Sequence, residues 1–368
     1  MSDYQIYCLH ENPNYYSFFS EIPKKIYEND SNYTKEDSKK VLAEINRFSD
    51  DSCLPLVAVK NGMACARLCA IIPDIPLKGY EKEKVGLIGY FEACNDSDII
   101  KAILDEAIEW FAKKNISKVI GPMDGDTWHR YRFVSEQSDN PVFLSEPYNP
   151  DYYSELWENY GFKKLAGYYS KFIPNVEFAL PIMERFYKRA VRNGFTFRTF
   201  NTDDFENELK KIYEISCDSF SDNFLYKEID KKEFIALYDK AKKIIKPELI
   251  WFCYDKNNVP CGFAFAIPDY GEMLRNLLQK SLIAKLKALW KFHFYDTVNL
   301  KSIGSLKRYK NKGVGPALTY KIYESTRKLK RKKVNMCLIH DNNVSGRLDG
   351  DHGEVFRRYT IYEKDIKK

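Results

Sequence analysis

The sequence of 368 residues lacks the cysteine patterns of metal-binding and disulfide-rich proteins. None of its nine cysteines forms a Cys-x-x-Cys pair, and most lie in apolar runs such as MACARLCAII. This distribution is typical of buried thiols in a reducing compartment and argues against a disulfide framework or a zinc site. We therefore expect no bound metal.

Long apolar segments are also missing. No 18 uncharged apolar residues occur together, and the opening residues MSDYQIYCLHENPNYY contain no basic segment followed by an apolar run. We therefore expect neither a membrane span nor a signal peptide, and a cytoplasmic location.

One pair of glycines stands in basic surroundings. Gly313 and Gly315, in KNKGVGPAL, precede a stretch that predicts a helix beginning near Pro316. Such a turn leaves N–H groups unpaired beside the positive end of the helix dipole, which favours an anion such as phosphate. It is not a Walker loop, because no Gly-Lys-Ser/Thr is present, and not a dinucleotide fingerprint, because Leu318 stands where the third glycine is needed.

Positive charge is concentrated around this turn. Residues 301–333 contain twelve Lys or Arg and one acidic residue, Glu324, although the whole chain carries a formal charge of only +6. Such a field would attract a multiply charged anion. The run RKLKRKK within it has a second interpretation, because cations at the end of the predicted helix complement the helix dipole.

Two pairs of segments indicate an internal duplication. Residues 56–74 and 249–269 each predict two strands around a turn, and Cys65 matches Cys261 at an offset of 196.

The segment that begins PYNPDYY predicts a helix capped by Asn149 and ended by Gly161, followed by a strand. The segment that begins DNNVSGR repeats this layout with Asn342 and Gly353 at nearly the same offset.

The halves run from residue 1 to about 180 and from about 190 to 368, joined by IMERFYKRAVRNG, which predicts a basic helix. Each half reads as a strand hairpin, a third strand, a helix, a strand, a second helix and a terminal strand. The predicted class is α/β with a mixed sheet, in two domains. Residues 270–292 form an insertion with helical apolar spacing, for which packing on its own domain is favoured over a lid or a membrane-surface helix.

Lys310-Asn-Lys-Gly313-Val-Gly315 resembles the signature of the GNAT superfamily of N-acetyltransferases, in which Gln or Arg, two residues, Gly, one residue, then Gly or Ala follow the fourth strand. LKSIGSLKRY stands where that strand is expected. The first half has LWENYGF, which is similar to a later family segment, but FEACNDSDIIKAI has no Gly-x-Gly and carries acids. The whole chain is similar to bacterial tandem-GNAT proteins. The resemblance implies a catalytic domain at 190–368 and a degenerate copy at 1–180.

The resemblance implies a site for acetyl-CoA as acyl donor. The residues implied for its pyrophosphate are Lys310, Asn311, Lys312, Gly313, Val314 and Gly315, and those implied for its pantetheine arm are Ser305, Leu306, Lys307 and Asn342. Two positions depart from the family pattern. Pro316 has no N–H to donate, and Lys310 offers a point charge where Arg would offer a planar fork.

The implied reaction is direct attack of an amine on the thioester. The family often supplies a proton to the leaving thiolate from a Tyr seven residues after the motif Asn; here that position is Asp349. An exposed Asp is ionised at neutral pH, so His352, which titrates in the right range, is our candidate substitute. The alternative is that both are loop residues. No Cys or Ser stands in a nucleophile arrangement, so we expect no covalent intermediate.

Other interpretations stay open. A sensor that binds coenzyme A without turnover is suggested by Asp349, and a tRNA-dependent aminoacyl transferase of similar tandem architecture is suggested by the basic segment, although we do not expect nucleic acid as the partner. Asp124, Asp126 and His129 combine carboxylates with imidazole but lack the spacing of a metal site. The acceptor amine, the acyl chain length and the oligomeric state are not predicted.

Overall fold

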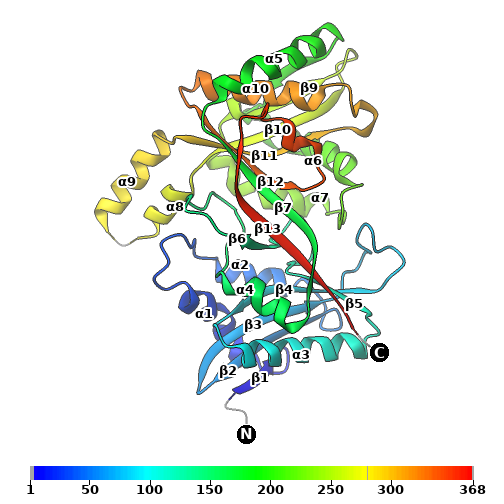
Figure 1. The fold of residues 1–368 in the computed structure, drawn as a ribbon, viewed down its shortest axis with the longest axis vertical. Helices are drawn as coiled ribbons and strands as arrows, with labels where there is room; N and C mark the ends of the chain where they lie inside the picture. Colours follow the sequence, from blue (N-terminus) through cyan, green and yellow to red (C-terminus); the bar gives the residue numbers. More distant parts are fainter. Residues whose placement is uncertain (1–3, 280, 367–368) are drawn as a thin grey trace.

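The computed structural model describes residues 4–279 and 281–366, which form one mixed sheet with helices on both faces (Figure 1). The strands of the described chain are β1 (Tyr4–Cys8), β2 (Cys53–Lys60), β3 (Met63–Ile71), β4 (Val85–Ala93), β5 (Lys118–Gly121), β6 (Phe133–Glu136), β7 (Lys163–Ile173), β8 (Thr196–Thr199), β9 (Ile250–Tyr254), β10 (Pro260–Pro268), β11 (Thr297–Ser305), β12 (Lys333–His340) and β13 (Glu354–Asp365). The α-helices are α1 (Tyr16–Ile26), α2 (Ser38–Ile45), α3 (Ser97–Lys113), α4 (Tyr152–Tyr160), α5 (Val176–Arg192), α6 (Phe205–Phe220), α7 (Lys231–Asp239), α8 (Gly271–Leu277), α9 (Leu282–His293) and α10 (Val314–Lys328). The predicted α/β class with a mixed sheet is confirmed.

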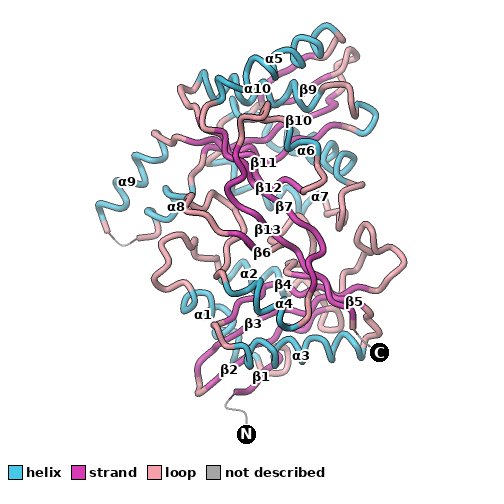
Figure 2. The backbone as a smooth tube through the Cα atoms, viewed as in Figure 1, coloured by secondary structure: helices cyan, strands magenta, loops and turns pink. Residues whose placement is uncertain are grey.

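The strand order is symmetric about the centre of the sheet. It runs β1-β2-β3-β4-β5-β13-β7-β12-β11-β10-β9-β8, with β6 paired to β13 (Figure 2). Five strands of each half therefore lead inward to the last strand of the other half: β5 pairs with β13, and β12 pairs with β7, both antiparallel. β7 and β13 also pair with each other. The two copies of the plan exchange their terminal strands, and the division near residues 180–190 falls within α5.

Both predicted hairpins are present. β2 and β3 pair antiparallel around Asn61 and Gly62, whose φ angles of 52° and 73° suit a tight two-residue turn. β9 and β10 pair antiparallel around a turn in which Asn258 has φ 60°. The joining segment forms α5 as predicted, and Gly161 ends α4 with φ 102°.

Two predicted helix caps are wrong. The Asn149 side chain does not cap α4 and instead accepts a hydrogen bond of 2.7 Å from the Val134 N–H on β6. After β12 only a short 3-10 helix forms, Val344–Arg347, and Asn343 rather than Asn342 caps it. Glycines and short polar side chains in this segment favour turns over an α-helix.

The insertion at 270–292 forms two helices instead of one. α8 and α9 pack against each other, and the side chains of Ala284 and Ala288 are buried against the protein. Phe292 of α9 also packs on the protein and stacks on the buried Tyr270 at 5.2 Å, whereas most other large apolar side chains of α9 are exposed. The expectation of a helix packed on its own domain is therefore correct for the face that carries the alanines and Phe292. Among the described helices, none has the length and apolarity needed to cross a membrane.

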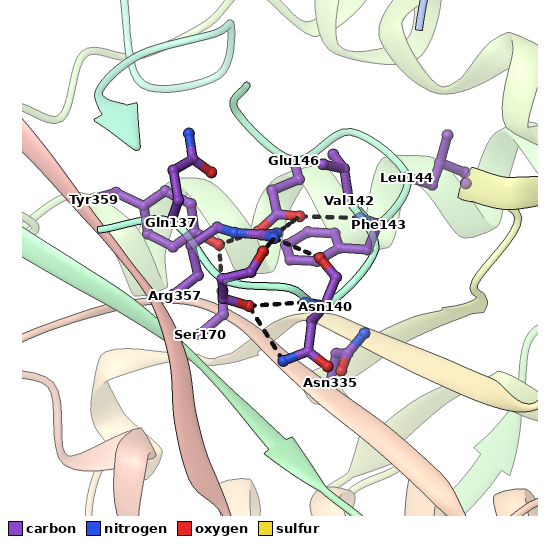
Figure 3. Close-up of polar contacts among 12 residues, drawn as sticks. Gln137, Asn140, Val142, Phe143, Leu144, Glu146, Ser170, Asn335, Arg357 and Tyr359 are labelled. Carbon is purple, nitrogen blue, oxygen red and sulfur yellow. Dashed lines mark hydrogen bonds and ion pairs between the residues drawn. The ribbon is translucent and has the colours of Figure 1, made fainter. Parts of the chain in front are cut away.

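A buried ion pair holds β13, one of the two exchanged strands, to the loop between β6 and α4 (Figure 3). Arg357 on β13 donates to Glu146 at 2.6 Å, and both side chains are at most 2% exposed. Glu146 also accepts from the Tyr359 hydroxyl and, at 2.9 Å, from the Phe143 N–H. Burial raises the pKa of Glu146, while Arg357 opposes that rise. Both oxygens of this carboxylate therefore accept hydrogen bonds in the folded state.

We predict that Arg357→Leu lowers the free energy of unfolding by about 3–5 kcal/mol, because Glu146 would stay buried without its counter-charge. Urea unfolding followed by circular dichroism measures the change. Arg358→Leu is the matched control, since this neighbour on β13 is 45% exposed and lies 3.5 Å from the exposed Glu136. The control should cost less than about 1 kcal/mol. Equal losses in the two variants would contradict the prediction.

Candidate functional site

The chain enters α10 through a turn with free backbone donors. Asn311 and Gly313 have φ angles of 64° and 83°, and Gly313 is the N-cap of α10. No side chain caps this helix, and the N–H groups of Asn311, Gly313, Val314 and Gly315 have no hydrogen-bond partner in the described chain. A Cβ on Gly313 would meet nothing within 4 Å. The turn therefore presents several unpaired donors at the positive end of a helix.

Exposed lysines surround the turn. The side chains of Lys310 and Lys312 are exposed, and Lys312 lies 5.0 Å from the ring centroid of Tyr309. Lys310 forms no ion pair with any described residue. The run from Arg327 onward lies at the other end of α10, about 21 Å away for a helix of this length. The basic segment is thus two separate groups of cations, and only the first accompanies the free N–H groups.

The backbone groups expected to meet a pantetheine arm already have partners. The Ser305 N–H donates to the Ser219 hydroxyl at 3.2 Å, and the Lys307 N–H donates to the Asp218 carboxylate at 2.6 Å. Asp218 and Ser219 end α6 and are half-buried. A ligand that pairs with this edge of β11 would have to displace these two side chains, which are accessible to solvent. Leu306 donates its N–H to Cys261 and faces away from the edge.

β11 and β12 diverge beyond their first four residues. They pair in parallel only from Thr297 to Leu300, so their carboxyl ends form an open fork. His340 ends β12 at the level of the Ser305 end of β11. Its Nδ1 accepts a hydrogen bond of 3.1 Å from the Asn342 N–H, and burial lowers the pKa of the imidazole. A neutral ring in this arrangement carries its proton on Nε2.

Asp349 has a structural partner in the folded chain. Its side chain is fully buried, and it accepts 2.6 Å from the Lys171 ammonium, 3.1 Å from the Asp351 N–H and 3.2 Å from the Gly353 N–H. These contacts close the turn that leads into β13. The carboxylate is neutralised by a lysine and does not face the fork.

His352 is exposed, and its ring lies 5.8 Å from that of Phe178 on α5. Glu354, two residues on, pairs with Phe172, which is level with Asn335 near the start of β12. Six residues of strand, about 20 Å, separate that level from Ser305. The structure therefore does not bring Asp349 or His352 to the turn before α10.

The fork between β4 and β5 in the first half is filled by a polar network. Glu92 accepts from Arg130 at 3.0 Å and from the hydroxyls of Tyr27 and Tyr153 at 2.8 and 2.9 Å. Arg130 also contacts Asp124 at 3.3 Å, and burial raises the pKa of Asp124. A small pocket lies among these side chains. The main chain of Ala93, which ends β4, bonds to the hydroxyls of α4 rather than to solvent.

Sequence reasoning missed His340, Arg130 and Glu92. Glu92 had a visible signal, because it is the one charged residue in the apolar strand VGLIGYFEA. His340 closes the predicted strand VNMCLIH two residues before Asn342, but its protonation depends on burial, which a sequence does not show. Among the described residues, no group of three or more His, Cys, Asp or Glu side chains is arranged to hold a metal ion.

No protein-family model matches the chain. Two curated relatives cover most of it. Protein YghO of Escherichia coli (strain K12) is 22% identical over 320 residues, which are 84% of this chain and 81% of the relative. The bacterial ceramide synthase of Caulobacter vibrioides is 20% identical over 362 residues, which are 95% of this chain and 94% of the relative.

Solved structures share the fold along the whole chain. A tandem GNAT protein from the clavulanic acid biosynthesis pathway aligns with a TM-score of 0.54 and 9% identity, covering 99% of both chains. A GCN5-related N-acetyltransferase from Sphaerobacter thermophilus aligns with a TM-score of 0.52 and 11% identity, covering 100% of this chain and 97% of its own. At these identities the likeness establishes the fold.

The pair Asp126–His129 beside the filled fork predicts a pH dependence of stability. The His129 Nδ1 lies 2.8 Å from Asp126, both side chains are at most 10% exposed, and their contact raises the pKa of His129 against the opposing effect of burial. A raised histidine pKa stabilises the fold below about pH 6.5 and the gain is lost as pH rises through the folded value. His129→Gln should therefore cost about 1–3 kcal/mol at pH 5 and less at pH 9.

Urea unfolding at both pH values measures this difference, with His293→Gln at the exposed end of α9 as control. A cost of His129→Gln that grows toward pH 9 would show that the pair does not act as described.

Proposed function

We propose that this chain, whose fold is that of tandem GCN5-related N-acetyltransferases, is an acyl-CoA-dependent N-acyltransferase with its donor site at the turn before α10. The observation that carries the proposal is the set of four unpaired N–H groups at a helix N-terminus, with exposed lysines beside them. The four are those of Asn311, Gly313, Val314 and Gly315, and the lysines are Lys310 and Lys312. Such a turn suits a pyrophosphate, because each donor is fixed by the backbone and the helix dipole favours negative charge.

The loop resemblance and the curated relatives lead to different expectations for the acyl group of the donor. The loop resemblance suggests acetyl-CoA. The relative described as a bacterial ceramide synthase favours a longer chain, since a ceramide carries a fatty acyl group on an amine nitrogen. Both donors share the coenzyme A moiety, so the turn before α10 serves either of them, and a chain-length series separates them.

In this proposal the half at 190–368 binds the donor, and the half at 1–180 is a degenerate copy. The two forks support this division differently. In the fork of the first half, two tyrosine hydroxyls of α4 hydrogen-bond to the N–H and the carbonyl of Ala93. In the second, the half-buried Ser219 and Asp218 cover the corresponding edge. Displacing two accessible side chains costs less than opening a buried network.

The protonation states of the cysteines and of His340 support direct attack of the acceptor amine on the thioester, without a covalent enzyme intermediate. Burial raises the pKa of Cys337 to about 12 and that of Cys94 to about 11, which disfavours a thiolate nucleophile at neutral pH. His340, neutral and with its proton on Nε2, ends β12 beside the fork and has a hydrogen-bond donor left for a ligand. We therefore propose His340, in place of His352, as the group that stabilises the leaving thiolate or the oxyanion.

The proposal predicts thiol release that depends on both a coenzyme A thioester and an amine. The assay presents acyl-CoA donors from two to sixteen carbons with a panel of amines. Gly313→Asp should abolish this turnover and weaken coenzyme A binding, measured by calorimetry, by at least about tenfold, because a carboxylate would face the pyrophosphate.

Gly62→Asp is the matched control, since Gly62 also has a positive φ and open space around its Cβ position but lies in the hairpin turn of the first half. It should leave turnover and binding unchanged. Binding without turnover on any amine would indicate a coenzyme A sensor. No binding at millimolar coenzyme A would rule out the donor site.

A further inference from the structure

Three arginine side chains are buried in the described chain, and one of them forms no ion pair with a described residue. Arg67 donates to Glu36 at 2.6 Å, and Arg357 donates to Glu146 at 2.6 Å. Arg132 is 6% exposed, and its Nε and Nη1 are buried without any hydrogen-bond partner. A buried guanidinium without an anion costs several kcal/mol.

Aromatic rings hold this guanidinium in place. Its central carbon lies 3.8 Å from the ring centroid of Tyr131 and 4.1 Å from that of Tyr168 on β7. The backbone of Arg132 has φ 72°, which is uncommon for a residue with a side chain. Stacking fixes the plane of the guanidinium but satisfies none of its N–H groups. The arginine is therefore oriented before any ligand arrives.

Arg132 lines the pocket in the fork of the first half, together with Glu92, Asp124, Arg130 and Tyr148. Arg130 donates to both Glu92 and Asp124, so the carboxylates of the pocket are already compensated. Arg132 is the one charged side chain lining the pocket that forms no ion pair with a described residue. Its position next to Tyr168, which stacks edge-on against His340 at 4.9 Å, puts the pocket at the junction with the second half.

We propose that Arg132 is a binding residue for one oxyanion group, a carboxylate or a phosphate, of a ligand that enters this pocket. Two oxygens of a carboxylate or a phosphate can accept two N–H groups of the guanidinium together. The site is separate from the donor turn before α10. The first half is then a ligand-binding element of the protein, and the inference stands whether or not the second half transfers an acyl group.

The test measures the unfolding midpoint in sodium acetate, sodium phosphate and sodium chloride at equal ionic strength and pH. Gly313→Asp serves as the background, so that phosphate bound at the donor turn does not contribute. We expect acetate, phosphate or both to raise the midpoint by at least about 2 °C over chloride. The arm that responds identifies the anion.

Arg132→Met in the same background should remove this rise, and in chloride it should raise the midpoint, because an unpaired buried charge is replaced by an apolar side chain of similar length. Arg358→Met, at an exposed site, should keep the rise. The proposal is overturned if neither anion stabilises the background protein. It is equally overturned if Arg132→Met lowers the midpoint in chloride and retains the response to anions.

α9 carries a second, independent feature, an apolar face without a partner. Leu282, Leu286 and Trp290 are 77%, 66% and 55% exposed. The other exposed apolar side chains of α8, α9 and their ends are Leu277, Leu278, Ile283, Leu289 and Phe294. In Figure 1 α9 lies at the margin of the molecule, away from the sheet. This concentration on one short helix exceeds the scattered apolar exposure of an ordinary surface.

The charges of α9 are all positive. Lys285 and Lys287 are exposed, Lys291 pairs with Glu272 at 2.8 Å, and the helix contains no acidic residue. Twelve helical residues span about 18 Å, which is shorter than the roughly 30 Å apolar core of a bilayer. We infer that α9 lies on an anionic lipid bilayer, with its leucines and Trp290 at the acyl boundary and its lysines at the headgroups.

Co-sedimentation with vesicles of phosphatidylcholine alone, or with one quarter phosphatidylglycerol, tests this inference. The protein should bind the anionic vesicles, and Leu286→Ser combined with Trp290→Ser should reduce binding at least about tenfold. Phe178→Ser combined with Phe186→Ser, at exposed positions of α5, is the matched control and should bind normally. Absence of binding, or a dimer in sedimentation velocity that the α9 variant abolishes, would overturn it.

Discussion

The ion pair between Arg357 and Glu146 links β13, near the end of the chain, to the loop before α4. β13 and β7 each pair with a strand of the other half, and Glu146 reaches β13 through both Arg357 and Tyr359. Burying two charges is favourable only when they pair with good geometry, because each charge loses its hydration. This pair therefore fixes the loop before α4 against β13, while the pairing of β7 and β13 joins the halves.

Local patterns predicted most elements but not their partners. The alternation and turn residues of both hairpins, the glycine that ends α4 and the basic helix between the halves are set by short-range preferences, and all are present. The exchange of β7 and β13 is not visible in those patterns, because either strand offers the same edge to β5 or β12. Asn149 and Asn342 failed as caps for a related reason, since tertiary contacts and glycine content outweighed the cap signal.

The part of the candidate site that is formed by backbone N–H groups could be predicted from the sequence. The sequence predicted unpaired N–H groups at the start of the helix, and the N–H groups of Gly313, Val314 and Gly315 are unpaired in the described chain. Side chains whose chemistry depends on burial were not predictable. Nothing in the sequence distinguishes Arg132 from other loop arginines. In the structure it differs from them by its stacking on aromatic rings and by buried N–H groups without a hydrogen-bond partner. Likewise, the neutral state of His340 follows from its surroundings.

One loop connects the features that the two inferences use. Arg275 on α8 donates to the Val142 carbonyl at 2.7 Å, and the Leu144 N–H donates to Asp269 at 3.3 Å, so the loop between β6 and α4 is fastened to the base of the α8–α9 insertion. A few residues later Tyr148 lines the pocket of Arg132. This loop therefore links the helix inferred to lie on a bilayer to the pocket of Arg132. An amphiphile with an anionic end is then the ligand chemistry that satisfies the apolar helix and the unpaired guanidinium together.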